Sequence, residues 1–391
     1  MGIDIARNAA PEENTMNRQH KAAKQQPIVP QHRAIHRMGR RAAVTTLRAL
    51  ILVAAIGAPV ALAQSTAPSG IGLAMYQGAD RMQRIIDGAK KEGEISIYTS
   101  APVDDVKVMT DAFEKKYGVK AKVFRTSSEK VLQRGVTEAR AGRNDVDIFE
   151  TNGPEMEALV REKMLAPVIS PTLTDLIPEA KFKHGAWVGT RLNIFAFAYN
   201  TNLVKKDELP KSYEDLLNAR WKGRLGIEAE DSDWFSGVVQ QMGEAKGLKL
   251  WKDIVATNGV SVRKGHTLLT NLVASGEIPM AITVYNYKAE QMKNKGAPLD
   301  WFVIPPAIAR ANGVGVAVKA PHPHAALLWY EFEISEEGQK ILFSRDFVPT
   351  NRRVETTLNK FPITFIDSAT ILDQGQKWEK LYQETFGAQG R

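Results

Sequence analysis

Hydrophobic and polar residues between residues 76 and 162 follow two spacings in turn. Four segments carry apolar side chains three or four positions apart, which predicts amphipathic helices. They are residues 76–92, 104–117, 128–141 and 156–162. Three short segments between them are rich in β-branched and aromatic residues, which predicts strands. They are residues 94–99, 119–124 and 146–149. Strands and helices in alternation are typical of an open α/β sheet with parallel strands.

A second set of strands and helices follows a long strand-like run at residues 187–200. The predicted strands are residues 225–227, 280–284, 301–304 and 313–318. The predicted helices are residues 234–242, 248–257, 268–274, 325–335 and 336–343. Two α/β units joined by long strands indicate two lobes around a cleft. We therefore expect an N-lobe at residues 75–195 and 303–350, and a C-lobe at residues 196–302 and 351–391.

The first 63 residues follow neither spacing. A polar, basic stretch is followed by a positively charged segment, by an almost wholly apolar run at residues 49–60, and by Ala61-Leu62-Ala63. This order predicts a secretory signal peptide that is cleaved after Ala63. The apolar run is shorter than the about 20 residues that a membrane-spanning helix needs. Met38 is a second candidate start of the chain, because residues 38–63 form a complete signal peptide. Residues 64–74, which follow the cleavage site, are expected to be flexible. The sequence leaves open whether the chain is exported by the general Sec pathway or by the twin-arginine pathway.

Loss of this segment changes the charge of the chain. It holds nine of the 52 Lys and Arg and three of the 44 Asp and Glu, so 43 basic and 41 acidic residues remain. A net charge of +2 without a basic block argues against a nucleic-acid-binding protein. The chain has no Cys, which excludes disulfides, thiolate zinc sites and a lipid-anchored N-terminal Cys. We therefore expect a protein that is free in the periplasm. We also expect it to be a monomer.

Polar residues follow each predicted strand of the N-lobe. Ser100 follows the first strand, Thr126 and Ser127 follow the second, and Asn152 follows the third. Ligands of open α/β sheets bind beyond the carboxyl ends of the strands. These four residues are therefore predicted to contribute to a ligand site from the N-lobe.

The C-lobe offers an acidic turn and a helix start. The turn, residues 228–234, contains four carboxylates and ends on Trp234, and we predict that Asp231 and Trp234 contact a ligand. Carboxylates there favour a cation or an amine, although Asp231 could equally cap the following helix. His266 and Thr267 precede a predicted helix, whose free backbone N–H groups suit an anion. These two residues are predicted ligand contacts, with plain helix capping as the alternative.

Two tyrosines directly follow the predicted strand at residues 280–284. Tyr285 and Tyr287 lie at positions i and i+2, and in an extended segment such side chains point the same way. Phenolates are hard oxygen donors that suit Fe(III), whereas neutral rings stack on organic ligands. Both are predicted binding residues, and both are metal ligands if the ligand is Fe(III). The alternative is that the two rings pack in the hinge.

No common catalytic motif supports an enzyme. The sequence contains no GxSxG, Walker A or HExxH pattern. The sequence motifs therefore give no support for an enzyme, and we expect no cofactor. The alternative of another class is a periplasmic hydrolase or metalloenzyme that uses the acidic cluster near Asp231.

Several segments in order resemble the extracellular solute-binding proteins of ABC importers, in the branch with the periplasmic ferric-ion-binding proteins. They are residues 93–99, 112–120, 145–149, 198–201, 221–226, 274–278 and 335–339. The resemblance implies a type II periplasmic-binding fold, α/β throughout, with two lobes and crossover strands that close on a small ligand. It also implies delivery of this ligand to an inner-membrane ABC permease, and transport rather than catalysis.

The ferric-binding ligand set matches this chain only in part. In the resembled branch a His follows the first strand, a Glu follows the third, and two adjacent Tyr follow the second-lobe strand. Here these positions hold residues 99–102, Asn152, and Asn286 with Tyr287, so only Tyr287 matches. Fe(III) would therefore need a different ligand set. An organic cation such as a polyamine and an anion such as a phosphonate stay open as ligands.

Overall fold

The structure, a computed structural model, describes residues 70–387. The predicted signal peptide and its cleavage after Ala63 lie outside the described residues, as does most of the segment expected to be flexible. The last part of that segment, Gly70–Ala74, forms a 3-10 helix whose Leu73 and Ala74 are buried. Within residues 70–387 we find no helix that combines the length and the apolar character needed to cross a membrane.

The first lobe is built on three parallel strands, as predicted. Strand β1 (Glu94–Thr99) lies between β2 (Lys120–Arg125) and β3 (Ile148–Asn152). The helices between and beside them are α1 (Arg81–Glu92), α2 (Val103–Tyr117), α3 (Ser128–Arg140) and α4 (Gly153–Arg161). Ile85 and Phe113 face the core, whereas Met82 and Val108 of the predicted apolar faces are 38% exposed. Each parallel strand runs into a helix that begins at the same edge of the sheet.

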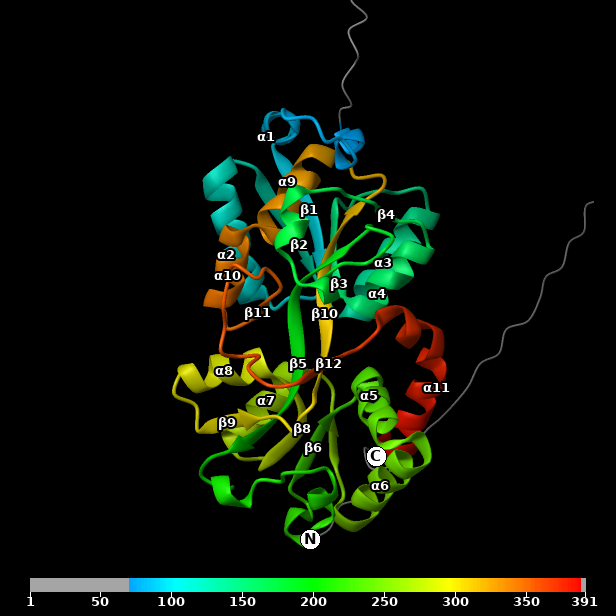
Figure 1. The fold of residues 1–391 in the computed structure, drawn as a ribbon, viewed down its shortest axis with the longest axis vertical. Helices are drawn as coiled ribbons and strands as arrows, with labels where there is room; N and C mark the ends of the chain where they lie inside the picture. Colours follow the sequence, from blue (N-terminus) through cyan, green and yellow to red (C-terminus); the bar gives the residue numbers. More distant parts are fainter. Residues whose placement is uncertain (1–69, 388–391) are drawn as a thin grey trace, which may run out of the picture. The chain divides into compact units, whose positions relative to one another are not determined.

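Two long strands connect the lobes (Figure 1). Strand β5 (Val188–Asn200) pairs through its first half with β10 (Ala307–Ala317) and β11 (Val348–Pro349). Its second half pairs with β8 (Met280–Tyr285) and β9 (Leu299–Phe302). All residues of β5 are buried, because both of its faces are covered.

The second lobe repeats the arrangement of the first. Strand β6 (Leu225–Glu228) pairs in parallel with β7 (Ser261–Arg263) and with β8. The helices are α5 (Ser232–Met242), α6 (Glu244–Asn258), α7 (His266–Ser275) and α8 (Asn286–Asn294). Along the main path of the sheet the strand order is β2-β1-β3-β10-β5-β8-β6-β7. The expected α/β architecture with two lobes and crossover strands is therefore confirmed.

The C-terminal part of the chain contacts both lobes. Helices α9 (Pro323–Ile334) and α10 (Glu336–Ser344) pack on the first lobe, and β12 (Ile363–Phe365) pairs with β10. Helix α11 (Ser368–Phe386), which the sequence analysis did not predict, packs on α4 of the first lobe and on α5 and α6 of the second (Figure 1). A short strand, β4 (Leu165–Ala166), completes the sheet beside β10.

Candidate functional site

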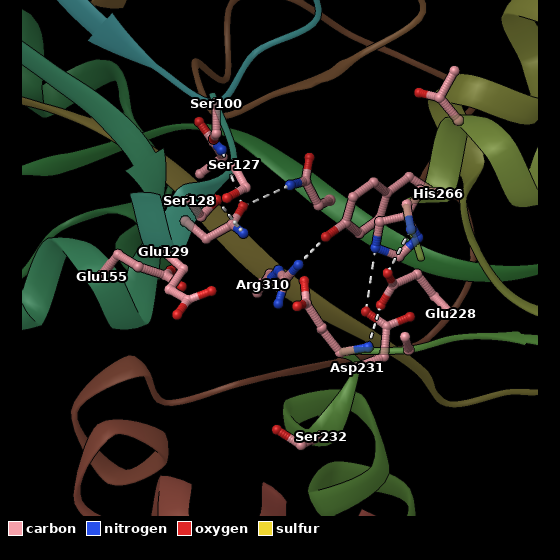
Figure 2. Close-up of a pocket in the computed structure, with 18 of the residues that line it drawn as sticks. Ser100, Ser127, Ser128, Glu129, Glu155, Glu228, Asp231, Ser232, His266 and Arg310 are labelled. Atoms are coloured by element: carbon pink, nitrogen blue, oxygen red, sulfur yellow. Dashed lines mark hydrogen bonds and ion pairs between the residues drawn. The ribbon is translucent and has the colours of Figure 1, made fainter. Parts of the chain in front are cut away.

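A cavity of about 600 Å³ lies where the carboxyl ends of the strands from both lobes meet. Its lining includes eight of the residues that the sequence analysis predicted. They are Ser100, Ser127, Asn152, Asp231, His266, Thr267, Tyr285 and Tyr287. Figure 2 shows Ser100, Ser127 and Ser128 on one side of this cavity, His266 and Asp231 on the other, and Arg310 between them.

Two predicted contacts do not line the cavity. Trp234 is 2% exposed and packs its ring against Trp251 and Tyr213 in the second-lobe core. Trp234 lies on the covered face of α5 and outside the cavity lining, which places its ring in the core, contrary to the predicted ligand contact. Thr126 uses its backbone N–H to extend the β1–β2 pairing and bonds the Thr99 carbonyl. The side chain before it, Arg125, lines the cavity instead.

Six helices begin at the cavity wall. Their N-cap residues are Pro102, Ser127, Asn152, Asp231, Gly265 and Tyr285, and each of them lines the cavity. Within the described residues, none of these N-cap side chains bonds the first turn of its helix. The N-terminus of a helix carries free N–H groups and a partial positive charge. The ends of six helices therefore bring hydrogen-bond donors to the cavity wall, although the Trp234 N–H of α5 and the Tyr287 N–H of α8 already donate to Asp233 and Asn286.

Amides and a hydroxyl form a network on the first-lobe side. The Asn152 side chain donates to the Ser128 hydroxyl at 2.8 Å and accepts from Asn312 at 3.1 Å and Asn193 at 3.3 Å. The side-chain amide oxygens of Asn193 and Asn312 have no hydrogen-bond partner within the described residues. Asn152, the predicted member, thus orients side chains from β5 and β10 that line the same cavity.

Arg310 is a site residue that the sequence analysis missed. It lies on β10, is 8% exposed, and pairs with the Asp233 carboxylate and with the Tyr285 hydroxyl. Glu155 of α4 also lines the cavity, and its Oε2 atom has no partner within the described residues. Burial raises the pKa of Glu155 to about 7, against the opposing effect of the Arg310 charge. The only sign of Arg310 in the sequence was a single Arg within a largely apolar strand.

The three rings of the second-lobe wall form a stack. The His266 ring lies 3.7 Å from the Tyr285 ring, and Tyr285 lies 5.8 Å from Tyr287 with the ring planes 18° apart. The expected extended segment is wrong, because Tyr285 ends β8 and Tyr287 lies in the first turn of α8. Asn286 between them is fully buried and bonds the Leu358 carbonyl at 3.1 Å. Burial raises the pKa of Tyr287 above its ordinary value.

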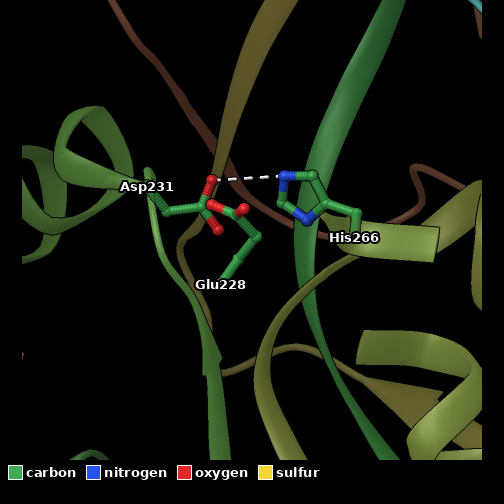
Figure 3. A group of neighbouring side chains, drawn as sticks. All are labelled: Glu228, Asp231 and His266. Carbon is green, nitrogen blue, oxygen red and sulfur yellow. Dashed lines mark ion pairs between the residues drawn. The ribbon is translucent and has the colours of Figure 1, made fainter. Parts of the chain in front are cut away.

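An acidic group lies next to this stack. Glu228 at the end of β6 is 3% exposed and Asp231 is 1% exposed. The Asp231 Oδ1 atom lies 3.2 Å from Nε2 of His266 (Figure 3). Glu228 accepts hydrogen bonds from the backbone N–H groups of Gly265 at 2.7 Å and of Glu230 at 2.5 Å. The predicted acidic turn therefore meets the predicted helix start at His266.

Helix α11 closes one part of the cavity. Glu379, Tyr382 and Gln383 line it, and the Tyr382 hydroxyl donates to the Glu228 carbonyl. These residues could not be placed from the sequence, because they follow no strand and reach the cavity only through the packing of α11 on both lobes.

Known proteins share this architecture. The sequence model of the family described as bacterial extracellular solute-binding protein matches residues 108–361. The chain belongs to this family. The Fe(3+)-binding periplasmic protein of Serratia marcescens is 26% identical to it over 264 residues, which are 65% of this chain and 77% of the relative. The major ferric iron-binding protein of Neisseria gonorrhoeae is 23% identical over 74% of this chain and 92% of the relative.

Solved structures of periplasmic binding proteins superpose on both lobes. Iron-bound HitA from Pseudomonas aeruginosa matches with a TM-score of 0.65 and 21% identity, over 75% of this chain and 99% of that structure. AfuA from Actinobacillus pleuropneumoniae with bound fructose-6-phosphate matches with a TM-score of 0.66 and 21% identity, over 76% and 99%. The expected fold of a two-lobed periplasmic binding protein and the expected class of a solute-binding protein are therefore confirmed. The matched relatives are binding proteins rather than enzymes.

Proposed function

We propose that this protein is the periplasmic receptor of an ABC importer and that its ligand is a small organic anion, such as a phosphonate or a phosphate ester. The single observation that carries the choice of an anion is the ring of six helix N-termini around the cavity. Backbone N–H groups at helix starts bind phosphate and carboxylate groups. The AfuA structure, which covers about as much of this chain as the HitA structure does, holds fructose-6-phosphate, and this is consistent with such a ligand.

The first-lobe side suits the anionic head group. The Ser100, Ser127 and Ser128 side chains lie at the starts of α2 and α3, and Arg125 brings a positive charge beside them. Arg310 extends this charge toward the second lobe, although Asp233 balances most of it. Hydroxyls, amides and a guanidinium together match the oxygens of a phosphate or phosphonate.

Capture of the ligand would use the two connecting strands as a hinge. Residues from both lobes line the cavity, so a ligand that contacts both stabilises the closed form. The closed receptor would then deliver the ligand to a membrane permease. We further propose that the mature chain begins after Ala63 and acts as a monomer.

Fe(III) is the second candidate ligand. The names of several relatives specify ferric iron, and Tyr285 and Tyr287 line the cavity here. Their hydroxyls could serve as phenolate ligands. The first-lobe positions argue against iron. Where the resembled branch has an imidazole and a carboxylate, this chain has Ser100 and Asn152, whose hydroxyl and amide groups are poor ligands for Fe(III).

A ligand panel separates these candidates. The purified mature protein is titrated calorimetrically with methylphosphonate, fructose-6-phosphate, citrate, spermidine and Fe(III) citrate, and its thermal stability is recorded with each. We expect a phosphorylated or phosphonate anion to bind with 1:1 stoichiometry and to raise the melting temperature. Binding of Fe(III) citrate with a visible absorbance band, but not of citrate alone, would favour the iron receptor. Multiple turnover of any bound compound would show an enzyme and overturn the proposal.

A further inference from the structure

Glu228, Asp231 and His266 bring three metal-binding side chains together at the second-lobe wall. One donor atom from each lies within 4.8 Å of the other two. They come from the end of β6, the turn before α5, and the first residue of α7. Figure 3 shows the Glu228 carboxylate lying between Asp231 and the His266 ring. None of the three positions belongs to the ferric ligand set that the sequence resemblance implied.

Two atoms of this group lack partners although they are buried. The Oδ2 atom of Asp231, a residue with 1% exposure, has no hydrogen bond within the described residues, and neither does Nδ1 of His266. A buried carboxylate oxygen without a partner is costly. Asp231 also lines the cavity, so its unpartnered oxygen lies buried beside the cavity wall.

The group holds more acidic than basic side chains. Glu228 and Asp231 place two carboxyl groups close together in a buried place, with the His266 imidazole beside Asp231. The neighbouring Arg310 is already paired with Asp233. A divalent cation would offset negative charge on the two carboxyl groups.

The geometry points to a divalent metal site formed by Glu228, Asp231 and His266, of the class that Zn²⁺ prefers. Zn²⁺ is bound by imidazole nitrogens and carboxylate oxygens, and a site with three protein ligands keeps a fourth position open for a further ligand. Ca²⁺ and Mg²⁺ favour oxygen ligands alone, and in greater number. The open position would face the cavity, because Asp231 and His266 both line it.

Such an ion would change the character of the acidic wall. Without it the carboxylates oppose an anionic ligand, whereas a bound Zn²⁺ would present positive charge to that ligand. This consequence rests on the proposed function, but the metal site itself does not. Metal binding and anion binding can therefore be tested separately.

The test is a titration of the chelator-treated, dialysed mature protein with ZnCl₂, followed by calorimetry and native mass spectrometry. We expect one Zn²⁺ per chain and much weaker binding of CaCl₂ and MgCl₂. Asp231→Asn and His266→Gln should each lower the Zn²⁺ affinity at least tenfold, because each removes one of three ligands. Glu230→Gln is the matched control, since Glu230 is a carboxylate of the same turn whose side chain pairs with Lys264; its affinity should stay within about twofold of wild type.

The inference is overturned if the wild-type protein binds no Zn²⁺, or if it binds Zn²⁺ equally well with Asp231→Asn and His266→Gln. The second outcome would place the ion on other histidines, such as His322 or His324. Circular dichroism and the melting temperature in chelator show whether both variants fold, and the two independent variants guard against a misfolded one. Anion binding in the presence of EDTA would leave the proposed function intact while the zinc titration decides the metal site.

Discussion

Nη1 of Arg191 lies 2.5 Å from Oε1 of Glu150, and both side chains are almost fully buried. Arg191 belongs to the connecting strand β5, and Glu150 belongs to β3 beside the cavity. Glu333 of α9 lies 4.0 Å from the same guanidinium. Burial, helped by the nearby Glu150 charge, raises the pKa of Glu333 to about 8. One Arg on the connecting strand thus faces two buried carboxyl groups.

Arg191→Met should therefore destabilise the protein strongly. The substitution keeps much of the side-chain volume but leaves the Glu150 carboxylate buried without its cation. Loss of one partner of a buried ion pair costs about 3–5 kcal/mol. Urea denaturation of both proteins measures the difference in the free energy of unfolding. Lys122→Met is the control, because the exposed Lys122–Glu94 pair should contribute nothing measurable. Equal loss in both variants would contradict the role of burial.

Glu155 should make stability depend on pH. The pKa of Glu155 is raised to about 7 by burial, so the folded state holds a proton that the unfolded state releases above pH 4.5. The contribution of this group to the free energy of unfolding therefore falls as pH rises from about 4.5 through 7. Arg310 opposes this shift, while Asp233 and Glu129 support it. Glu155→Gln should thus be more stable than wild type at pH 8, by up to about 3 kcal/mol.

Unfolding curves at pH 5, 6, 7 and 8 test this dependence. The difference between Glu155→Gln and wild type should grow with pH and level off above pH 7. The buried Glu333 adds a similar slope to both proteins, so only their difference reports Glu155. A difference that stays constant with pH would show that Glu155 titrates at its ordinary pKa.

Trp234→Ala tests whether Trp234 belongs to the core or to the site. Its ring packs against Trp251 at 5.3 Å and Tyr213 at 6.3 Å between centroids. Loss of such a buried ring costs about 3–5 kcal/mol. Chemical denaturation should show this loss, while calorimetry on the folded fraction should show a ligand affinity within about twofold of wild type. A large loss of affinity without a loss of stability would restore the sequence prediction.

The alternation of strands and helices was predictable because it rests on local hydrophobic spacing. The strand ends were predictable for the same reason, and Ser100, Ser127 and Asn152 follow from them. Trp234 was misplaced because periodicity does not tell which face of α5 the second-lobe core covers. Arg310 and the α11 residues could not be found, since their position depends on the pairing of β10 and on the packing of a tail that contacts both lobes.

Tyr287→Phe should distinguish the two candidate ligands. The Tyr287 ring packs on Phe347 at 4.2 Å and lines the cavity, and burial raises the pKa of its hydroxyl. An organic anion is bound by N–H groups and cations, so removal of this hydroxyl should change its affinity by less than about tenfold, the effect of roughly one neutral hydrogen bond. Fe(III) would instead lose a phenolate ligand. Its visible absorbance band should then weaken or disappear.

Tyr285→Phe provides the matched comparison for this experiment. Tyr285 stacks on the same side of the cavity, but its hydroxyl bonds Arg310. For an anionic ligand, Tyr285→Phe frees the Arg310 guanidinium, so affinity should stay or rise slightly. For Fe(III), both variants should lose absorbance, because each phenolate contributes to the band. Calorimetry with methylphosphonate or fructose-6-phosphate, and visible spectra with Fe(III) citrate, are recorded on both variants. Anion affinity that falls more than a hundredfold in Tyr287→Phe alone would mean that the anion binds the Tyr287 hydroxyl directly, contrary to the placement of its head group at the first lobe.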